Sequence, residues 1–154
     1  GIDDYMVEIG GEMVVRGRNP EGKPWRVGVN RPTIEDGEAG TIEEVLQMTG
    51  GGLATSGNYR NYRVVDGKRI AHTIDPVTGY PVQHSLLSAT VLAPDCMTAD
   101  AYATAFMVMG LERSRALVDS LPGIEALFLY QNPTDTARID CWVTAGMQKL
   151  ILKK

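Results

Sequence analysis

An aspartate and a threonine stand one helical turn apart in the small-residue segment Thr98-Ala99-Asp100-Ala101-Tyr102-Ala103-Thr104-Ala105. In an α-helix, positions i and i+4 share a face, so the Asp100 carboxylate and the Thr104 hydroxyl converge. Two hard oxygens at this spacing suit Mg²⁺, which completes its shell with water and phosphate. In the structural alternative, Asp100 lies in the first turn and caps the helix, while Thr104 packs. The alanines between them suit either close ligand approach or helix packing.

A second group of polar residues lies in the turn-rich segment Ala71-His72-Thr73-Ile74-Asp75-Pro76-Val77-Thr78-Gly79-Tyr80-Pro81. Its Asp-Pro and Thr-Gly pairs are typical of a fixed turn, whose backbone amides and carbonyls are available to a flat heterocycle. His72 suits phosphate positioning or acid–base chemistry near neutral pH, and equally a hydrogen-bonded structural role. Asp75 is expected to brace the turn through an Asx-type bond. His84 has no supporting motif, and we expect it to be structural.

The third motif is Ala-Thr-Ser-Gly-Asn-Tyr at residues 54–59. Thr55 and Ser56, just ahead of Gly57, offer hydroxyls and open backbone amides to an anion or a flavin, although a Ser-Gly pair is also common in ordinary turns. A triad of Ser56 with His72 and Asp75 is conceivable, but the spacing does not require it. The sequence contains no G-x-S-x-G elbow, Walker loop or H-E-x-x-H pattern.

The elements expected to position these residues are strands, then helices, then strands. Gly110 and Pro122-Gly123 are natural ends for the two helices, and Asp66-Gly67 suits the turn of a hairpin. Segment 42–48 is compatible with either a helix or a strand and is ended by the triple glycine at 50–52, while 32–40 reads as an exposed loop. Strands are predicted at 5–9, 13–16 and 25–29 as a meander, at 58–65 and 68–70 as the hairpin, and at 86–92, 126–130 and 139–144; helices are predicted at 97–109 and 111–121. This order favours an α+β fold, a mostly antiparallel sheet with a packed helical pair.

The bulk composition fits one globular domain. The chain has 154 residues, of which 44% are hydrophobic and 22% charged, and a net charge of −4, which argues against a nucleic-acid partner. No apolar run approaches the roughly 20 residues of a membrane span. Cys96 and Cys141 form no C-x-x-C motif; we expect two unpaired, mostly buried thiols, with a disulfide between them left open.

As a set, the three motifs resemble those of the ApbE family, the FAD:protein FMN transferases. The resemblance covers most of the chain, from Tyr5 to the final strands. Gly10-Gly11-Glu12 between two strands, the segment 25–32 that follows, and the three motifs stand in the family's order and spacing. The resemblance therefore implies an ApbE-like fold and a flavin as the substrate.

The same resemblance assigns roles to individual residues. Asp100 and Thr104 match the family's magnesium ligands, Ile74 matches a position whose backbone contacts FAD, and His72 matches a histidine implicated in binding or catalysis. The motif of Thr55, Ser56 and Gly57 is expected to contact the flavin. The family cleaves FAD at its pyrophosphate, attaches FMN to a threonine hydroxyl of a partner protein and releases AMP. Its targets are subunits of respiratory electron-transport complexes outside the cytoplasm.

The sequence departs from the family pattern in what it lacks. An N-terminal half with flavin-contacting aromatic residues, and a lipoprotein signal, are absent from these 154 residues. We therefore expect residues 1–154 to be the C-terminal portion of a single ApbE-like domain, inactive alone, from a periplasmic protein anchored as a lipoprotein to the inner membrane. Two alternatives are a magnesium-dependent FAD pyrophosphatase that yields FMN and AMP, and a non-catalytic flavin-binding domain.

Overall fold

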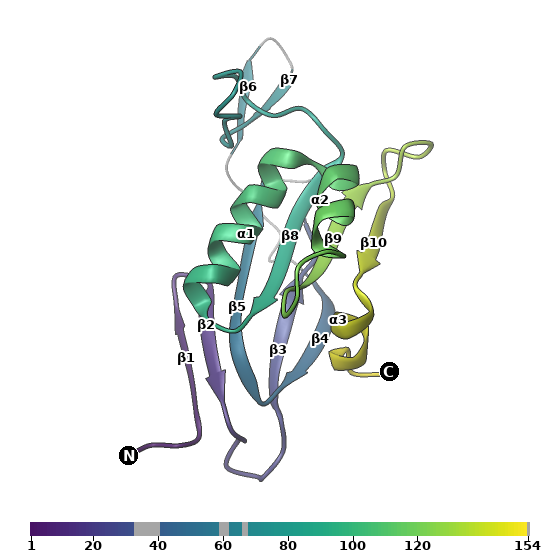
Figure 1. Cartoon of the computed structure of the whole chain (residues 1–154). Helices are drawn as coiled ribbons and strands as arrows, with labels where there is room; N and C mark the ends of the chain where they lie inside the picture. Colours follow the sequence, from purple (N-terminus) through teal and green to yellow (C-terminus); the bar gives the residue numbers. More distant parts are fainter. Residues whose placement is uncertain (33–40, 59–61, 66–67, 154) are drawn as a thin grey trace.

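The computed structural model describes residues 1–32, 41–58, 62–65 and 68–153. Strands and helices follow one another as the α+β prediction requires (Figure 1). The strands are β1 (Tyr5–Ile9), β2 (Glu12–Arg16), β3 (Trp25–Asn30), β4 (Ile42–Met48), β5 (Gly50–Gly57), β6 (Tyr62–Val65), β7 (Lys68–Ala71), β8 (Leu86–Ala93), β9 (Glu125–Gln131) and β10 (Ile139–Val143). The helices are α1 (Cys96–Met109), α2 (Leu111–Val118) and α3 (Ala145–Leu150).

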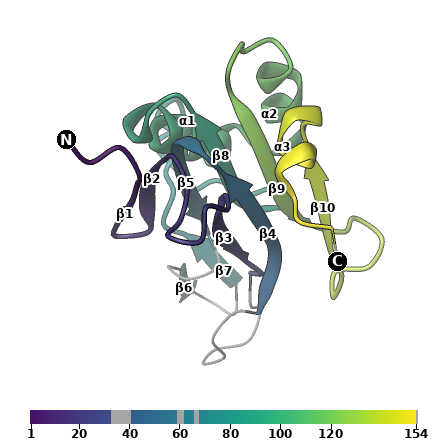
Figure 2. The same cartoon turned by 90° about the horizontal axis from the view of Figure 1, so that it is seen from below.

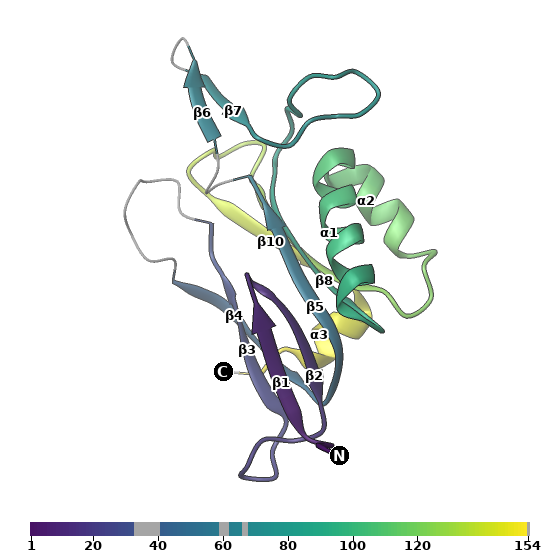
Figure 3. The ribbon, with the colours of Figure 1, turned by 90° about the vertical axis from the view of Figure 1, so that its left-hand side faces the viewer.

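A six-stranded sheet in the order β1-β2-β5-β8-β9-β10 forms the centre of the molecule. Every neighbouring pair in it is antiparallel. Helices α1 and α2 cover one face, and the two-stranded β3–β4 sheet lies against the other, as Figures 2 and 3 show. The predicted antiparallel sheet and helical pair are therefore confirmed.

Side chains alternate between two hydrophobic cores because successive residues of a strand point to opposite faces. Ala54 and Phe128 join the core under α1 and α2, where Phe128 meets Phe106 edge to face with ring centroids 5.3 Å apart. Their chain neighbours Leu53 and Leu127 join the core under β3–β4. The central strands are therefore buried on both sides, and the helices sit against a rigid surface.

Four sequence predictions are corrected. The expected meander is wrong at β3, which pairs with β4 rather than with β2. Strand β5 was not predicted: the triple glycine follows the end of β4, as expected, but it also opens β5, which carries the third motif in the middle of the sheet. Helix α2 ends at Val118, three residues early, and the short helix α3 was not expected.

Other predictions are settled or fall outside the described residues. The ambiguous segment 42–48 is strand β4. The hairpin is confirmed by the antiparallel pairing of β6 with β7, while its Asp-Gly turn and residues 33–40 of the expected loop lie outside the described residues.

Cys96 and Cys141 are free, as expected, but Cys141 is exposed rather than buried. Within the described ranges, no helix is long and apolar enough to cross a membrane.

Candidate functional site

Helix α1 begins one residue earlier than the sequence predicts, at Cys96 rather than Met97. Asp95 is its N-cap, and its carboxylate accepts hydrogen bonds from the Thr98 amide at 2.8 Å and the Thr98 hydroxyl at 2.9 Å. These bonds lower the pKa of Asp95 because they stabilise the ionised carboxylate. The structural alternative in which Asp100 caps the helix is therefore wrong. Asp100 lies in the second turn of the helix and is exposed to solvent.

Helix α1 approaches strand β5 closely at a glycine. A Cβ built on Gly52 would lie 2.2 Å from the Cys96 amide nitrogen and 2.5 Å from the Cys96 Cα, so only glycine fits there. From Gly52 to Ser56 the strand advances about 13 Å. From Cys96 to Thr104 the helix advances about 12 Å. A contact at Gly52 therefore places the two elements alongside each other as far as Ser56 and Thr104.

Two of the three motifs meet at that point. The Ser56 Oγ lies 3.0 Å from the Thr104 Oγ1, although 48 positions separate the two residues in the chain. Asp100 lies one turn before Thr104 on the exposed side of α1. One carboxylate and two hydroxyls thus occur on one surface, and each is held by a regular element.

The neighbouring Thr55 points to the other face of the sheet. Its hydroxyl shares a hydrogen bond of 2.8 Å with that of Thr90, its cross-strand partner in β8. Gly57 ends the strand opposite Ser88. The structure therefore places Ser56, but not Thr55, on the surface that carries Asp100 and Thr104.

The loop that follows β7 is a built turn, as predicted. The Asp75 carboxylate accepts from the Val77 amide at 2.8 Å, which is the expected Asx-type bond. Backbone bonds from Asp75 to Tyr80 and from Val82 to Thr73 close the turn. The exposed residues His72 and Ile74 are therefore presented on an ordered loop.

This loop is attached to β5 and lies beyond the C-terminal end of α1 (Figures 1 and 3). The Thr73 hydroxyl bonds to the Asn58 side chain at 2.6 Å, directly after β5. At the other side, the His84 Nε2 lies 2.8 Å from the Met107 carbonyl oxygen, which confirms the structural role expected for His84. The loop that carries His72 and Ile74 is therefore tied both to the residue that follows β5 and, through His84, to α1.

The donor set on α1 and β5 fits magnesium in its chemistry. Mg²⁺ prefers hard oxygen ligands and usually keeps several waters alongside one or two protein ligands. The Asp100 carboxylate and the Thr104 hydroxyl are oxygen groups of this kind. Among the described residues, no three His, Cys, Asp or Glu side chains group together.

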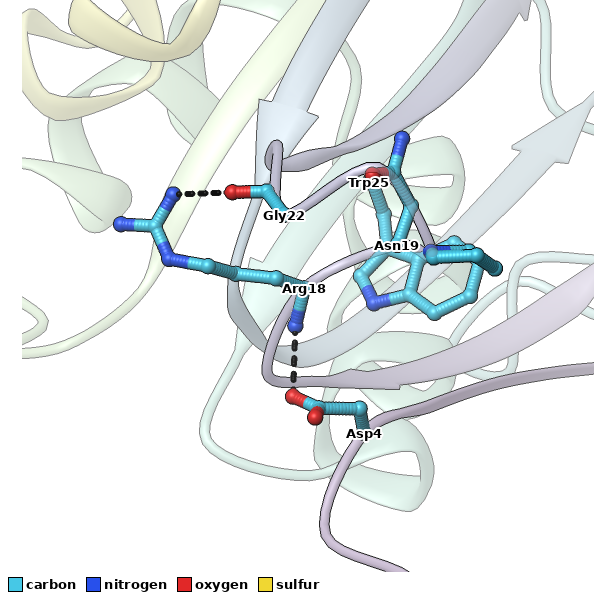
Figure 4. Close-up of a pocket in the computed structure, with 6 residues that line it drawn as sticks. Asp4, Arg18, Asn19, Gly22 and Trp25 are labelled. Carbon is cyan, nitrogen blue, oxygen red and sulfur yellow. Dashed lines mark hydrogen bonds between the residues drawn. The ribbon is translucent and has the colours of Figure 1, made fainter.

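A separate cavity of about 410 Å³ lies at the turn between β2 and β3, away from the three motifs (Figure 4). Its polar groups already bond to one another: the Arg18 amide donates to the Asp4 carboxylate at 2.8 Å, and the Arg18 guanidinium donates to the Gly22 carbonyl at 3.1 Å. The Trp25 Nε1 donates to the Arg16 carbonyl at 3.1 Å. These contacts hold the turn together.

The comparisons with known proteins agree on one family. Residues 1–128 match the model of the ApbE family. A Klebsiella pneumoniae (strain 342) protein named FAD:protein FMN transferase is 47% identical over 118 residues, which are 77% of this chain and 33% of that protein. A protein of the same name from Escherichia coli (strain K12) is 38% identical over 154 residues, which are 100% of this chain and 42% of that protein.

A solved structure shows the same fold. Pseudomonas stutzeri flavinyl transferase ApbE, in its apo form, matches with a TM-score of 0.79 and 35% sequence identity, over 97% of this chain and 44% of that chain. The chain spans less than half the length of the relatives it matches.

Proposed function

The chain belongs to the ApbE family, and on that premise we propose that it supplies part of the site at which FMN is transferred from FAD to a threonine hydroxyl of an acceptor protein, with release of AMP. The names of the relatives support flavin transfer as the reaction. Because this chain covers 42% of the Escherichia coli relative, we propose a contribution to the site rather than the whole of it.

One observation carries the proposal: the third motif and the helix motif meet at the 3.0 Å contact between Ser56 and Thr104, one turn from Asp100. The arrangement offers a negative charge and neutral oxygens on an exposed surface, as binding of a hydrated cation and a phosphate requires.

In this proposal Asp100 and Thr104 hold Mg²⁺, and Ser56 borders them. When bound, the ion supplies Lewis acidity against the charge of the FAD pyrophosphate. The acceptor hydroxyl forms a new bond to the phosphorus on the FMN side, and the bond from that phosphorus to the AMP oxygen breaks. We assign to His72 the proton released by the acceptor hydroxyl, because imidazole accepts a proton near neutral pH. Gly57 and the Ile74 backbone are assigned to flavin contacts, whereas the predicted contact from Thr55 is not retained because its hydroxyl bonds to Thr90 on the opposite face of the sheet.

We further propose that the acceptor is a respiratory electron-transport subunit and that the reaction takes place in the periplasm, in a lipoprotein held at the inner membrane. This rests on the family resemblance of the motifs. Fractionation of the source cells, followed by detection of the chain with an antibody, tests the location. Recovery in the cytoplasmic fraction would exclude it.

A chimera tests the activity. The segment of the Escherichia coli relative that aligns with this chain is replaced by residues 1–154, and a threonine-bearing acceptor domain is incubated with FAD, Mg²⁺ and the chimera. We expect an intact-mass gain of one FMN, which is lost in the Asp100→Ala chimera; the 154-residue chain alone should transfer little or none. A folded chimera that releases free FMN and AMP without an adduct would instead establish a pyrophosphatase. Flavin binding with neither product would leave a binding domain.

A further inference from the structure

We propose that Ser56 is a positioning residue for the metal ligand Thr104: it fixes the direction of the Thr104 hydroxyl so that a lone pair faces the same side as Asp100. The inference rests on the proposed function, since it concerns the ion that Asp100 and Thr104 would hold. It gives Ser56 a role different from direct flavin contact. The observation behind it is the contact of 3.0 Å between the two hydroxyl oxygens.

The proton of Thr104 decides the direction of this hydrogen bond. A hydroxyl has one proton and two lone pairs, and a neutral hydroxyl binds a cation through a lone pair. The proton must then point away from the cation, toward an acceptor. The Ser56 Oγ is such an acceptor, so Thr104 donates to Ser56 in the metal-bound form. Ser56 keeps its own proton for another acceptor, for example a phosphate oxygen.

Without Ser56 the hydroxyl has a competing partner within its own helix. Threonine in a helix divides between two χ1 rotamers, because its Oγ1 can bond to the carbonyl oxygen three or four residues earlier. For Thr104 these are the carbonyls of Ala101 and Asp100. A hydroxyl turned onto either one is withdrawn from the exposed surface. The bond to Ser56 therefore selects the rotamer that a metal ligand needs.

The contact is also geometrically fixed. Ser56 is partly buried and pairs with Ala89 of β8, and α1 rests on the same strand at Gly52. Side chains that orient a metal ligand from such rigid elements typically change metal affinity by about 10–100-fold when they are removed. We expect a loss in this range for Ser56→Ala.

Mn²⁺ binding to the chimera of residues 1–154 with the rest of the Escherichia coli relative tests the inference, with free Mn²⁺ measured by electron paramagnetic resonance as the readout. Asp100→Asn should remove binding, and Ser56→Ala should weaken it about 10–100-fold. Ser56→Thr, which keeps a hydroxyl, should restore most of the affinity. In a Thr104→Val background, Ser56→Ala should cause no further loss.

The matched control is Thr90→Val. It also removes a hydroxyl-to-hydroxyl bond of similar length, 2.8 Å to Thr55, but on the opposite face of the sheet. Its Mn²⁺ affinity should equal that of the wild type. Equal losses in Thr90→Val and Ser56→Ala would show a general structural effect and overturn the inference.

The remaining outcomes separate the inference from the function on which it rests. Wild-type affinity in Ser56→Ala, with binding lost in Asp100→Asn, would overturn the positioning role and leave the proposed metal ligands standing. An additional loss from Ser56→Ala in the Thr104→Val background would show that Ser56 acts independently of Thr104, and would also overturn it. Binding that is absent in the wild type, or intact in Asp100→Asn, would overturn the ligand assignment and the inference together.

Discussion

Replacing Gly52 with alanine is expected to lift the start of α1 away from the sheet. The new Cβ would lie 2.2 Å from the Cys96 nitrogen, 2.3 Å from the Asp95 carbonyl carbon and 2.5 Å from the Cys96 Cα. Comfortable contacts between non-bonded carbon atoms are about 3.5–4.0 Å. All three contacted atoms belong to the backbone, so no side chain can rotate away, and the helix itself must move by about 1 Å to restore ordinary contact.

The expected cost follows from two opposing effects. Overpacking a well-packed interior typically costs about 1–3 kcal/mol, and a shift of the backbone belongs at the upper end of that range. Replacing a glycine within a strand by alanine returns about 0.5–1 kcal/mol. We therefore expect the free energy of unfolding to fall by about 2–2.5 kcal/mol. For a chain of this size that corresponds to a Tm lower by about 4–10 °C.

Displacement of the helix should also reach the candidate site. The hydrogen bond between Ser56 and Thr104 is 3.0 Å long, and an outward movement of about 1 Å would exceed the range of a hydrogen bond. Thermal unfolding followed by circular dichroism gives the Tm, and electron paramagnetic resonance gives the Mn²⁺ affinity. Both quantities should fall in Gly52→Ala.

Gly50→Ala is the control within the same triple glycine. A Cβ there meets only the Val15 carbonyl oxygen at 3.9 Å, an ordinary contact, so its Tm should be unchanged or slightly higher. If the Tm and Mn²⁺ affinity of Gly52→Ala both match the wild type, then α1 is not held against β5 at this point, and the geometric argument for the site fails.

Three further predictions concern side chains around this framework. Because the pKa of Asp95 is lowered in the folded protein, its ionised carboxylate stabilises the fold at pH values above the ordinary pKa of 3.8, and this stabilisation is lost as the pH falls through the lower pKa of the folded state. The Tm difference between wild type and Asp95→Ala should therefore be clear at pH 7 and shrink toward pH 2. Although Cys141 as a residue is exposed, its thiol is partly shielded from water, and this shielding, with Glu43 and Glu44 nearby, raises the pKa of Cys141 to about 11. Alkylation of Cys141 in Cys96→Ser should therefore accelerate about tenfold per pH unit from pH 8 to 10; a plateau near pH 9 would contradict this. The Arg115 guanidinium lies 5.3 Å from the centre of the Trp142 ring, and Arg115→Gln should cost about 0.5–1 kcal/mol in urea unfolding, whereas equal stability would show that the contact contributes nothing.

Local patterns predicted most of the elements correctly. The helix at 97–109 follows from the helix propensity of its residues. Gly110 was expected to end it, and in the structure this glycine adopts a positive φ of 78° that other residues rarely tolerate. Strand β5 did not follow, because three consecutive glycines are typical of a break. In the folded chain, pairing with β2 and β8 stabilises this segment, and the close approach of α1 requires Gly52. Tertiary contacts thus override the local signal.

The residues of the candidate site likewise divide into those whose relation local spacing predicts and those that only the fold brings together. The relation between Asp100 and Thr104 is local, so the four-residue spacing predicted it, and both residues do lie on α1. The Ser56–Thr104 bond joins positions 48 residues apart and depends on how a helix settles on a strand, which no local spacing encodes. The opposite orientation of Thr55 likewise follows only from the knowledge that the motif is a strand. The sequence therefore identified the motifs, while the fold decides which of their side chains meet.

The contact between α1 and β5 places an upper limit on side-chain volume at every second position of the strand. Gly52, Ala54 and Ser56 face the helix, whereas Leu53, between them, fills the opposite core. As related sequences diverge, the helix-facing positions should therefore keep small residues even in descendants that have lost the flavin chemistry. Small side chains at these positions indicate only that a helix packs against the strand. The hydroxyl group of Ser56, and not the small size of its side chain, is the feature that indicates the candidate site.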